Sequence, residues 1–139
     1  MIKNLAHICI TTADLAATEN FYCSVLGLKK HFSFMRDNEE CGFYIAVGEN
    51  SYIEFFSQSP EMASKPKESS VFQHICLETD EIDAVISRLK TEDIDVTEKM
   101  LGADNSWQCW LEDPNGLKIE IHQYTAQSTQ ITGADCELK

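Results

Sequence analysis

Hydrophobic and polar residues alternate along several short stretches of the chain, a pattern typical of strands with one buried face. In the first stretch, residues 4–10, the side chains of Leu5, His7 and Cys9 share one face, and Ile8 lies on the other. Three more strand-like stretches follow, separated by polar turns. Their expected ranges are 28–36, 42–48 and 51–57.

A helix is expected between the first two of these strands. Asp14 is a favourable N-cap residue, helix-forming residues follow it, and Gly27 stands where a glycine commonly ends a helix. The stripe that faces the core is expected to contain Leu15, Tyr22 and Leu26, with Phe21 and Val25 at its edges.

The second half of the chain repeats this order of elements. A strand at 71–78 precedes Asp80, which is expected to cap a second helix. The apolar residues of that helix have the i, i+3, i+4, i+7 spacing of a buried face: Ile82, Val85, Ile86 and Leu89. The remaining strands are expected at 95–100, 107–112 and 117–124, with an Asp-Pro-Asn-Gly turn at 113–116.

This order of elements predicts an α+β fold made of two tandem βαβββ modules. Together the modules are expected to form a concave, barrel-like mixed sheet with the helices on the outside. We expect one domain over residues 1–125, followed by a loosely ordered, polar C-terminal tail at 126–139. Within the domain, module 1 is expected at 1–58, a linker with two of the three prolines at 59–70, and module 2 at 71–125.

The two modules also share a sequence repeat. The tripeptide His-Ile-Cys at 7–9 returns at 74–76, and the dipeptide Ile-Glu at 53–54 returns at 119–120. The histidine and the glutamate are 47 residues apart in the first copy and 46 residues apart in the second. The chain therefore contains one module twice, and each copy carries one histidine and one glutamate.

Strand alternation indicates where these polar side chains point. In the second copy, the isoleucines beside Glu120 should face the helix, so Glu120 and His74 should face away from it. The same parity places Glu54, Phe56 and Gln58 on the concave face of the first copy. A glutamate between large apolar residues in mid-strand is costly to bury unless it is paired or bound to a metal.

His7, Glu54, His74 and Glu120 therefore predict a site for one divalent metal ion. Two imidazoles and two carboxylates suit Ni²⁺, Zn²⁺, Co²⁺, Mn²⁺ or Fe²⁺, and the pattern does not select among them. Taken singly, a strand histidine is more often a hydrogen-bonded pocket residue, and a mid-strand glutamate more often lies at an exposed edge. The duplication of the pair favours the metal. His122, two residues beyond Glu120, is expected to line the pocket rather than to act as a fifth ligand.

Composition narrows the classes of partner. The formal net charge of −12 argues against nucleic acids and anionic membrane surfaces as partners. No stretch of about 20 apolar residues occurs, and no signal peptide is evident. The six cysteines form no CxxC pair, which favours free thiols in a reducing cytoplasm. With four protein ligands, an octahedral metal would keep two open positions, enough to chelate a small-molecule substrate through two oxygens.

The chain resembles the vicinal oxygen chelate superfamily, which includes glyoxalases, bleomycin-resistance proteins and dioxygenases. The resemblance covers about residues 3–125 and rests on the four ligand positions, the Asp-Pro-Asn-Gly turn at 113–116, and the Phe-Tyr and Leu-Gly-Leu sequences at 21–22 and 26–28. Within the superfamily the chain most resembles the small bacterial glyoxalase I, or lactoylglutathione lyase, type.

This resemblance implies a metal held by His7, Glu54, His74 and Glu120 in a homodimer whose sites are shared between chains. It also implies a lyase that isomerises the hemithioacetal of methylglyoxal and a thiol, with Glu120 as the base and Glu54 as its near-symmetric partner. Such chemistry serves methylglyoxal detoxification. The acid at position 54 favours this branch, because dioxygenase and fosfomycin-resistance relatives generally lack it and epimerase relatives usually carry a glutamine there.

Two substrate-pocket positions differ from the glyoxalase I pattern. Thr11 stands where the pattern has a glutathione-binding arginine, and Gln58 stands where it has an asparagine. The thiol therefore stays open. So do two alternatives: another metalloenzyme of the superfamily, such as an epimerase, a thiol transferase or a dioxygenase, and a metal-free protein that sequesters a drug-like ligand.

Overall fold

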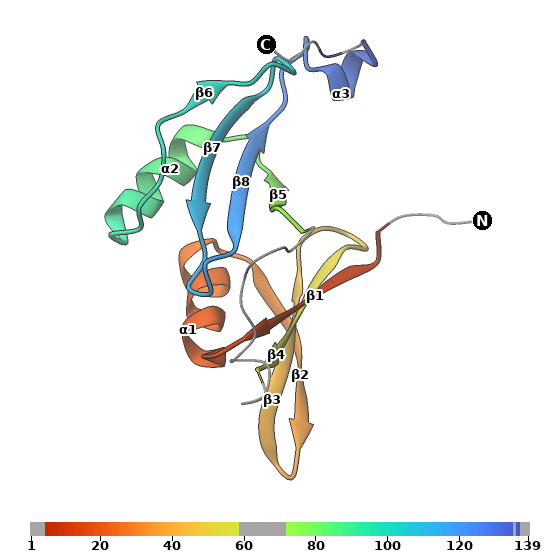
Figure 1. Ribbon diagram of the computed structural model, residues 1–139, viewed down its shortest axis with the longest axis vertical. Helices are drawn as coiled ribbons and strands as arrows, with labels where there is room; N and C mark the ends of the chain where they lie inside the picture. Colours follow the sequence, from red (N-terminus) through yellow and green to blue (C-terminus); the bar gives the residue numbers. More distant parts are fainter. Residues whose placement is uncertain (1–4, 59–71, 135, 137–139) are drawn as a thin grey trace, which may run out of the picture. The chain divides into compact units, whose positions relative to one another are not determined.

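The computed structural model describes residues 5–58, 72–134 and 136, and the chain divides into two compact units, Met1–Val71 and Phe72–Lys139. Each unit contains one βαβββ module, which confirms the α+β class and the duplicated architecture (Figure 1). The expected linker at 59–70 lies outside the described residues.

The first unit is a four-stranded mixed sheet with a helical segment after its first strand. Its strand order is β1-β4-β3-β2, in which β1 is parallel to β4 and the other neighbours are antiparallel. The elements are β1 (His7–Thr12), α1 (Leu15–Glu19), the π-helical η1 (Asn20–Val25), β2 (Lys29–Arg36), β3 (Glu39–Ala46) and β4 (Tyr52–Ser57).

The second unit repeats this topology. Its strand order is β5-β8-β7-β6, again with the first and last strands parallel. The elements are β5 (Ile75–Glu78), α2 (Ile82–Thr91), β6 (Met100–Leu101), β7 (Trp107–Glu112), β8 (Lys118–Gln123) and the short α3 (Thr129–Thr132).

In each unit the helices cover one face of the sheet, and the apolar residues of the central strands supply the core. In the first unit Phe55 is fully buried and its ring lies 4.7 Å from that of Tyr22, which comes from η1. In the second unit Ile119 and Ile121 of β8 are buried together with Ile82 of α2. The opposite face of each sheet therefore receives the alternate side chains of the same strands.

The helix after β1 departs from the expected regular helix. Asp14 caps it as predicted, because its carboxylate accepts a hydrogen bond from the Ala17 backbone N–H at 2.9 Å. Beyond Glu19, however, the helix widens to the i→i+5 pattern, in which the Leu26 N–H donates to the Phe21 carbonyl at 2.9 Å. The residues that this segment buries are Thr18, Phe21, Tyr22 and Val25, whereas Leu15 and Leu26 are only half-buried.

The expected stripe is therefore partly wrong. The wider turns rotate Leu26, which follows them, relative to a regular α-helix, but they do not account for Leu15, which precedes them. Gly27 ends the segment with φ of 74°, as predicted for a glycine at this position.

The prediction that Asp80 caps α2 is wrong. Glu81 is the N-cap residue and makes no side-chain capping bond. The side-chain oxygen of Gln123, from β8, accepts a hydrogen bond from the Ile82 N–H at 3.0 Å instead. A tertiary contact from the last strand of the module thus satisfies the start of the helix, a role that no local sequence pattern would reveal.

Two other segments differ in extent from their predictions. The strand expected at 95–100 is reduced to β6 and an isolated bridge between Val96 and Leu111. Part of the segment expected to be a loosely ordered tail contains α3, and Ser128 ahead of it is fully buried and accepts a hydrogen bond from Ser106 at 2.8 Å.

Within the described residues, no helix has the length and hydrophobicity needed to cross a membrane.

Replacing Gly42 with alanine should destabilise the first unit. A Cβ at this buried position would meet the backbone oxygen of Phe55 and would lie 2.6 Å from the Phe56 ring. We expect a loss of about 1–3 kcal/mol in the free energy of unfolding, measured by urea denaturation. Gly48→Ala is the matched control, because nothing lies within 4 Å of its added Cβ. Equal stabilities of the two variants would contradict this account of the β3–β4 packing.

Candidate functional site

Strand pairing positions the predicted histidines and glutamates. In the first module Cys9 of β1 lies opposite Glu54 of β4, and in the second Cys76 of β5 lies opposite Glu120 of β8. Because side chains alternate along a strand, each histidine, two residues before its cysteine, shares the face of the glutamate. The duplicated spacing in the sequence thus produces the same local arrangement twice.

Each module brings its own histidine and glutamate together. The distance from His7 Nε2 to Glu54 Oε2 is 3.9 Å, and that from His74 Nε2 to Glu120 Oε2 is 3.4 Å. The glutamate side chains are 17% and 10% exposed, whereas the histidines are 44% and 38% exposed. Each pair is therefore a buried carboxylate with a solvent-accessible imidazole beside it. How the two pairs lie relative to each other stays a prediction, because each belongs to a separate unit.

The distance between the histidine nitrogen and the glutamate oxygen of each pair suits two ligands of one divalent metal ion. Two ligand atoms bound to a tetrahedral ion at 2.0–2.1 Å lie about 3.3 Å apart. The His74–Glu120 distance is close to this value, and the His7–Glu54 distance requires a small movement of one side chain. The carboxylates and imidazoles present at these positions fit ions such as Zn²⁺, Ni²⁺ or Co²⁺.

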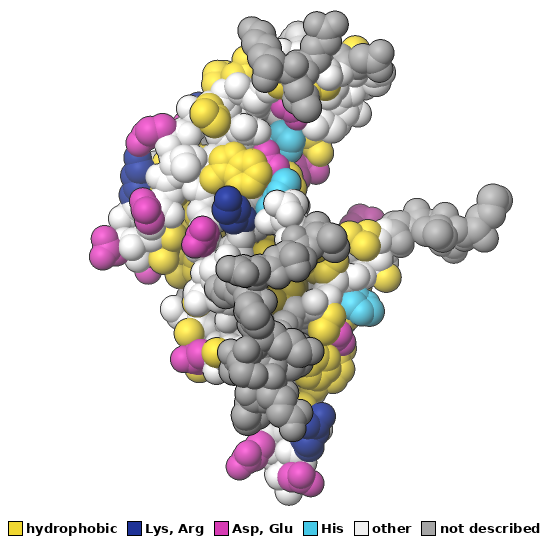
Figure 2. Space-filling model, viewed as in Figure 1, with side chains coloured by type: hydrophobic (Ala, Val, Ile, Leu, Met, Phe, Trp, Pro, Cys, Tyr) yellow, Lys and Arg dark blue, Asp and Glu magenta, His cyan; other side chains and the backbone are white. Residues whose placement is uncertain are grey.

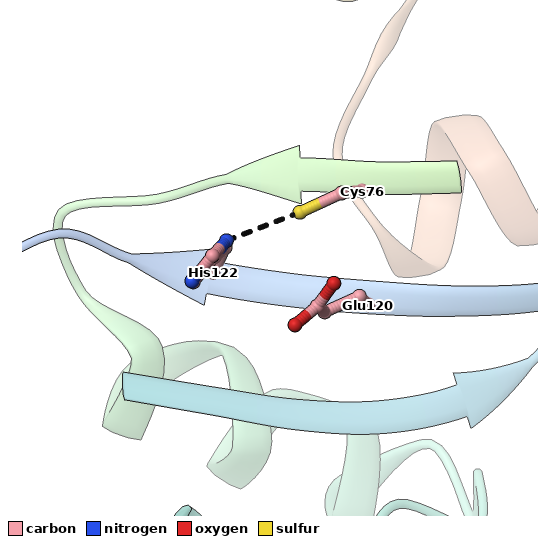
Figure 3. A group of neighbouring side chains, drawn as sticks. All are labelled: Cys76, Glu120 and His122. Carbon is pink, nitrogen blue, oxygen red and sulfur yellow. Dashed lines mark hydrogen bonds between the residues drawn. The ribbon is translucent and has the colours of Figure 1, made fainter. Parts of the chain in front are cut away.

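The second module adds a thiol and a second imidazole to its pair. His122 Nδ1 lies 3.4 Å from the sulfur of Cys76, and Glu120 lies beside both on β8 (Figure 3). The ligand atoms of these three residues are all within 4.8 Å of one another. His122 is buried, as is expected of a residue that lines a site, and Cys76 is exposed. In Figure 2, histidine and acidic side chains lie next to each other on the surface of the second unit.

The loop between β6 and β7 supplies an acid to the other side of His122. Asp104 Oδ2 lies 3.2 Å from His122 Nε2, although that buried nitrogen has no hydrogen-bond partner among the described residues. Burial alone would raise the pKa of Asp104, but hydrogen bonds from Gln130 and Ser106 hold it below its usual value. A carboxylate is thus kept ionised beside the imidazole.

Loss of hydration, together with the adjacent glutamates, suppresses ionisation of Cys76 and Cys9. Loss of hydration, followed by the charge and hydrogen bond of Glu120, raises the pKa of Cys76 to about 12. Loss of hydration and then Glu54 raise the pKa of Cys9 to about 11. Both thiols are therefore protonated at neutral pH in the absence of a cation, and neither has the electropositive surroundings of a nucleophilic cysteine.

The expected substrate-pocket residues of the first module share one face of its sheet. Thr11 lies opposite Phe56 in the β1–β4 pairing, and Gln58 follows β4 with the same parity. An aromatic cluster continues this face: the rings of Tyr44 and Tyr52 stack at 5.1 Å. His122, the fourth expected pocket residue, belongs to the second unit, so its place in a common pocket stays a prediction.

Sequence reasoning missed two members of the second module's cluster. Cys76 is not among the residues that the sequence analysis expects at the site, although its parity with His74 is a signal for a place there. Asp104 carries no such signal, because a loop rather than a repeating strand pattern positions it.

The profile of the Glyoxalase/Bleomycin resistance protein/Dioxygenase superfamily matches residues 6–110 of the chain. The chain belongs to this superfamily. The match spans most of both modules, which agrees with the resemblance found in the sequence.

Individual relatives agree with this assignment. Uncharacterized protein YaeR of Escherichia coli (strain K12) is 27% identical over 128 residues, covering 88% of this chain and 97% of YaeR. The antibiotic-binding protein TnmS3 of Streptomyces sp. CB03234 has a TM-score of 0.72 at 18% identity, covering 89% of this chain and 98% of TnmS3. Lactoylglutathione lyase of Agrobacterium tumefaciens has a TM-score of 0.65 at 20% identity, covering 88% of this chain and 94% of that chain. At these identities the two solved structures establish the fold alone.

In metal-free protein, Cys76 should react slowly with iodoacetamide. At pH 8 a thiol whose pKa is about 12 is ionised to about one part in 10⁴, whereas one at the ordinary value of 9.0 is ionised to about one part in ten. We expect alkylation, followed by peptide mass spectrometry, to be at least about 100-fold slower at Cys76 than at the exposed Cys136. Glu120→Gln should accelerate the alkylation of Cys76. The control variant Glu112→Gln, at an exposed position, should leave the rate unchanged. Equal rates in the two variants would contradict the role of Glu120 in raising the pKa of Cys76.

Proposed function

We propose that the protein is a metal-dependent, glyoxalase I-like lyase. Its reaction would convert the hemithioacetal formed by a 2-oxoaldehyde, such as methylglyoxal, and a thiol into a 2-hydroxyacyl thioester. The observation that carries the proposal is the repeated His–Glu pair, placed by equivalent parallel strands in both modules with separations of 3.9 and 3.4 Å.

His7, Glu54, His74 and Glu120 would hold one divalent ion. When bound, such an ion stabilises negative charge that develops on the substrate oxygens. The histidines are the accessible members of each pair and the glutamates the buried ones. In this proposal the imidazoles serve as ligands throughout, while a carboxylate is available for proton transfer.

Glu120 is our candidate for the base that moves a proton between adjacent substrate carbons. Its side chain is more buried than that of Glu54, and a positioned carboxylate can accept a proton from a carbon atom of the substrate. Glu54, at the equivalent strand position, would take the complementary role in returning the proton. Both residues are expected to matter, with the larger effect at Glu120.

The thiol co-substrate is expected to be a compound other than glutathione. Thr11 has no charge with which to bind a glutathione carboxylate, and the net charge of −12 gives no long-range attraction to an anion. The stacked rings of Tyr44 and Tyr52, which lie near His7 and Glu54 in the strand pairing, offer an apolar surface instead. A less anionic thiol is the favoured co-substrate.

We further propose that the protein acts in the cytoplasm as a homodimer in which each site takes one module from each chain. The free state of all six cysteines, which lie within the described residues, supports a reducing compartment. Each His–Glu pair is complete within one module and supplies half of the four ligands, so a module of either chain can contribute its half of a site.

Ligand sequestration without catalysis is the second candidate function. The aromatic face of the first module favours it: the Phe32 and Tyr44 rings stack at 4.7 Å, and Phe34 lies 4.6 Å from Phe56. TnmS3, which shares the fold, is an antibiotic-binding protein. In this case the protein would bind a planar apolar compound without turnover.

Glu120→Gln should reduce turnover of methylglyoxal with a panel of thiols by about 10²–10⁴-fold, because the amide cannot accept the proton. Thioester formation is the readout, and elemental analysis should show that part of the metal remains bound. Glu112→Gln on the neighbouring strand is the matched control and should retain full activity, because Glu112 is exposed. Full activity of Glu120→Gln would contradict the assigned base, and a wild-type protein that takes up no divalent ion would favour the sequestration alternative.

Two inactive variants should complement each other if the sites are shared between chains. One carries His7→Ala and Glu54→Ala, the other His74→Ala and Glu120→Ala. A mixed dimer would contain one site with all four ligands, so random exchange should restore about a quarter of the wild-type activity. The measurement is activity after mixing and subunit exchange, with each variant alone as control. No recovery, despite exchange shown by native mass spectrometry, would mean that sites are not shared.

A further inference from the structure

We propose that Cys76, Glu120 and His122 form a binding site of their own for a thiophilic divalent cation such as Zn²⁺, built entirely within the second module. This site goes beyond the proposed lyase function and does not require it. It differs from the four-ligand set in using a sulfur and a second imidazole, and it shares Glu120 alone with that set.

The separation of the donor atoms fits such a site. A sulfur at 2.3 Å and an imidazole nitrogen at 2.0–2.1 Å from a tetrahedral zinc ion lie about 3.5 Å apart. The observed distance between Cys76 Sγ and His122 Nδ1 is 3.4 Å. The Glu120 carboxylate completes a three-donor cluster with all ligand atoms within 4.8 Å, so only small side-chain movements are needed. The exposed cysteine leaves the cluster accessible from solvent.

The surroundings of His122 match those of a metal-bound histidine. A histidine that ligates a metal through one ring nitrogen commonly directs the other toward a carboxylate, which fixes the tautomer and strengthens the ligand. His122 Nδ1 lies 3.4 Å from the sulfur of Cys76, and Nε2 lies 3.2 Å from Asp104 Oδ2. Asp104 is itself held by Gln130, whose side-chain amide donates to it at 2.6 Å. The contact between Nε2 and Asp104 has the distance of an ion pair but not the geometry of a hydrogen bond among the described residues. The tautomer with its hydrogen on Nε2, facing this acid, leaves Nδ1 free for a cation.

The first module lacks this site, although it has the same strands. Cys9 lies opposite Glu54 as Cys76 lies opposite Glu120, but the position equivalent to His122 is occupied by Phe56. No comparable group of three donors occurs there among the residues that the structure describes. The two modules therefore provide an internal comparison in which one residue type makes the difference.

Binding would release one proton. The cation replaces the hydrogen on Cys76 Sγ, the proton passes to water, and the sulfur binds as thiolate. The cation also neutralises the repulsion between that thiolate and the Glu120 carboxylate. Because Glu120 belongs to both donor sets, a cation in this site and a metal held by the four-ligand set would compete for it.

Cobalt(II) added to the metal-free full-length protein tests this site, because a thiolate–Co²⁺ bond gives a charge-transfer absorption band in the near ultraviolet. We expect this band in the wild type, its loss in Cys76→Ser, and its displacement by Zn²⁺. The matched control is Cys9→Ser, which should retain the band. His122→Gln should weaken the affinity for Co²⁺ at least about tenfold, since one of three protein ligands is lost.

The double variant His7→Ala, Glu54→Ala separates this site from the proposed lyase site. It removes half of the four-ligand set and should retain the thiolate band, whereas lyase activity should be lost. Circular dichroism of each variant establishes that the fold is intact. Absence of the band from wild-type protein, its persistence in folded Cys76→Ser, or its loss in Cys9→Ser would overturn the proposal and leave the lyase assignment standing.

Discussion

The parallel hydrogen-bonded pairing between the first and last strand of each module is the constraint on which both candidate sites depend. It sets Cys9 opposite Glu54 and Cys76 opposite Glu120, and thereby aligns each histidine with its glutamate. A slip of one residue would turn the glutamate toward the buried helical face and an isoleucine toward the site. The apolar residues that alternate with Glu120, Ile119 and Ile121, are almost fully buried, so the core itself opposes such a slip.

Much of this arrangement could be predicted from sequence because it repeats. The near-equal spacing of the two His–Glu pairs and the alternation around them indicated the modules, the strand faces and the pairs. The details of helix formation could not be predicted in the same way. The π-helical turns before Gly27 are tied to the burial of Phe21 and Tyr22 against the sheet, and α2 begins on an oxygen from Gln123. Both features depend on contacts between segments distant in sequence, which local propensity does not encode.

The polar cluster around His122 shows the same limit at the level of the site. Its strand members could be placed on a face by parity, but their distances depend on side-chain conformations that packing determines. Asp104 comes from a loop and is anchored through Gln130 and Ser106, in a network that also holds α3 against the loop. The polar C-terminal segment therefore has a structural role: it orients an acid beside a buried imidazole. The polar composition of this segment predicts only a loosely ordered tail.

Phe56 and His122 occupy equivalent places in two copies of the same framework. Substitutions at such a position leave the strand pairing unchanged, because neither backbone hydrogen bonds nor the helical core involve these side chains directly. One copy therefore carries an aromatic side chain at this position, and the other carries an imidazole. A chain of 139 residues thus carries two chemically distinct surfaces on one repeated architecture, an aromatic one in the first module and a polar one in the second.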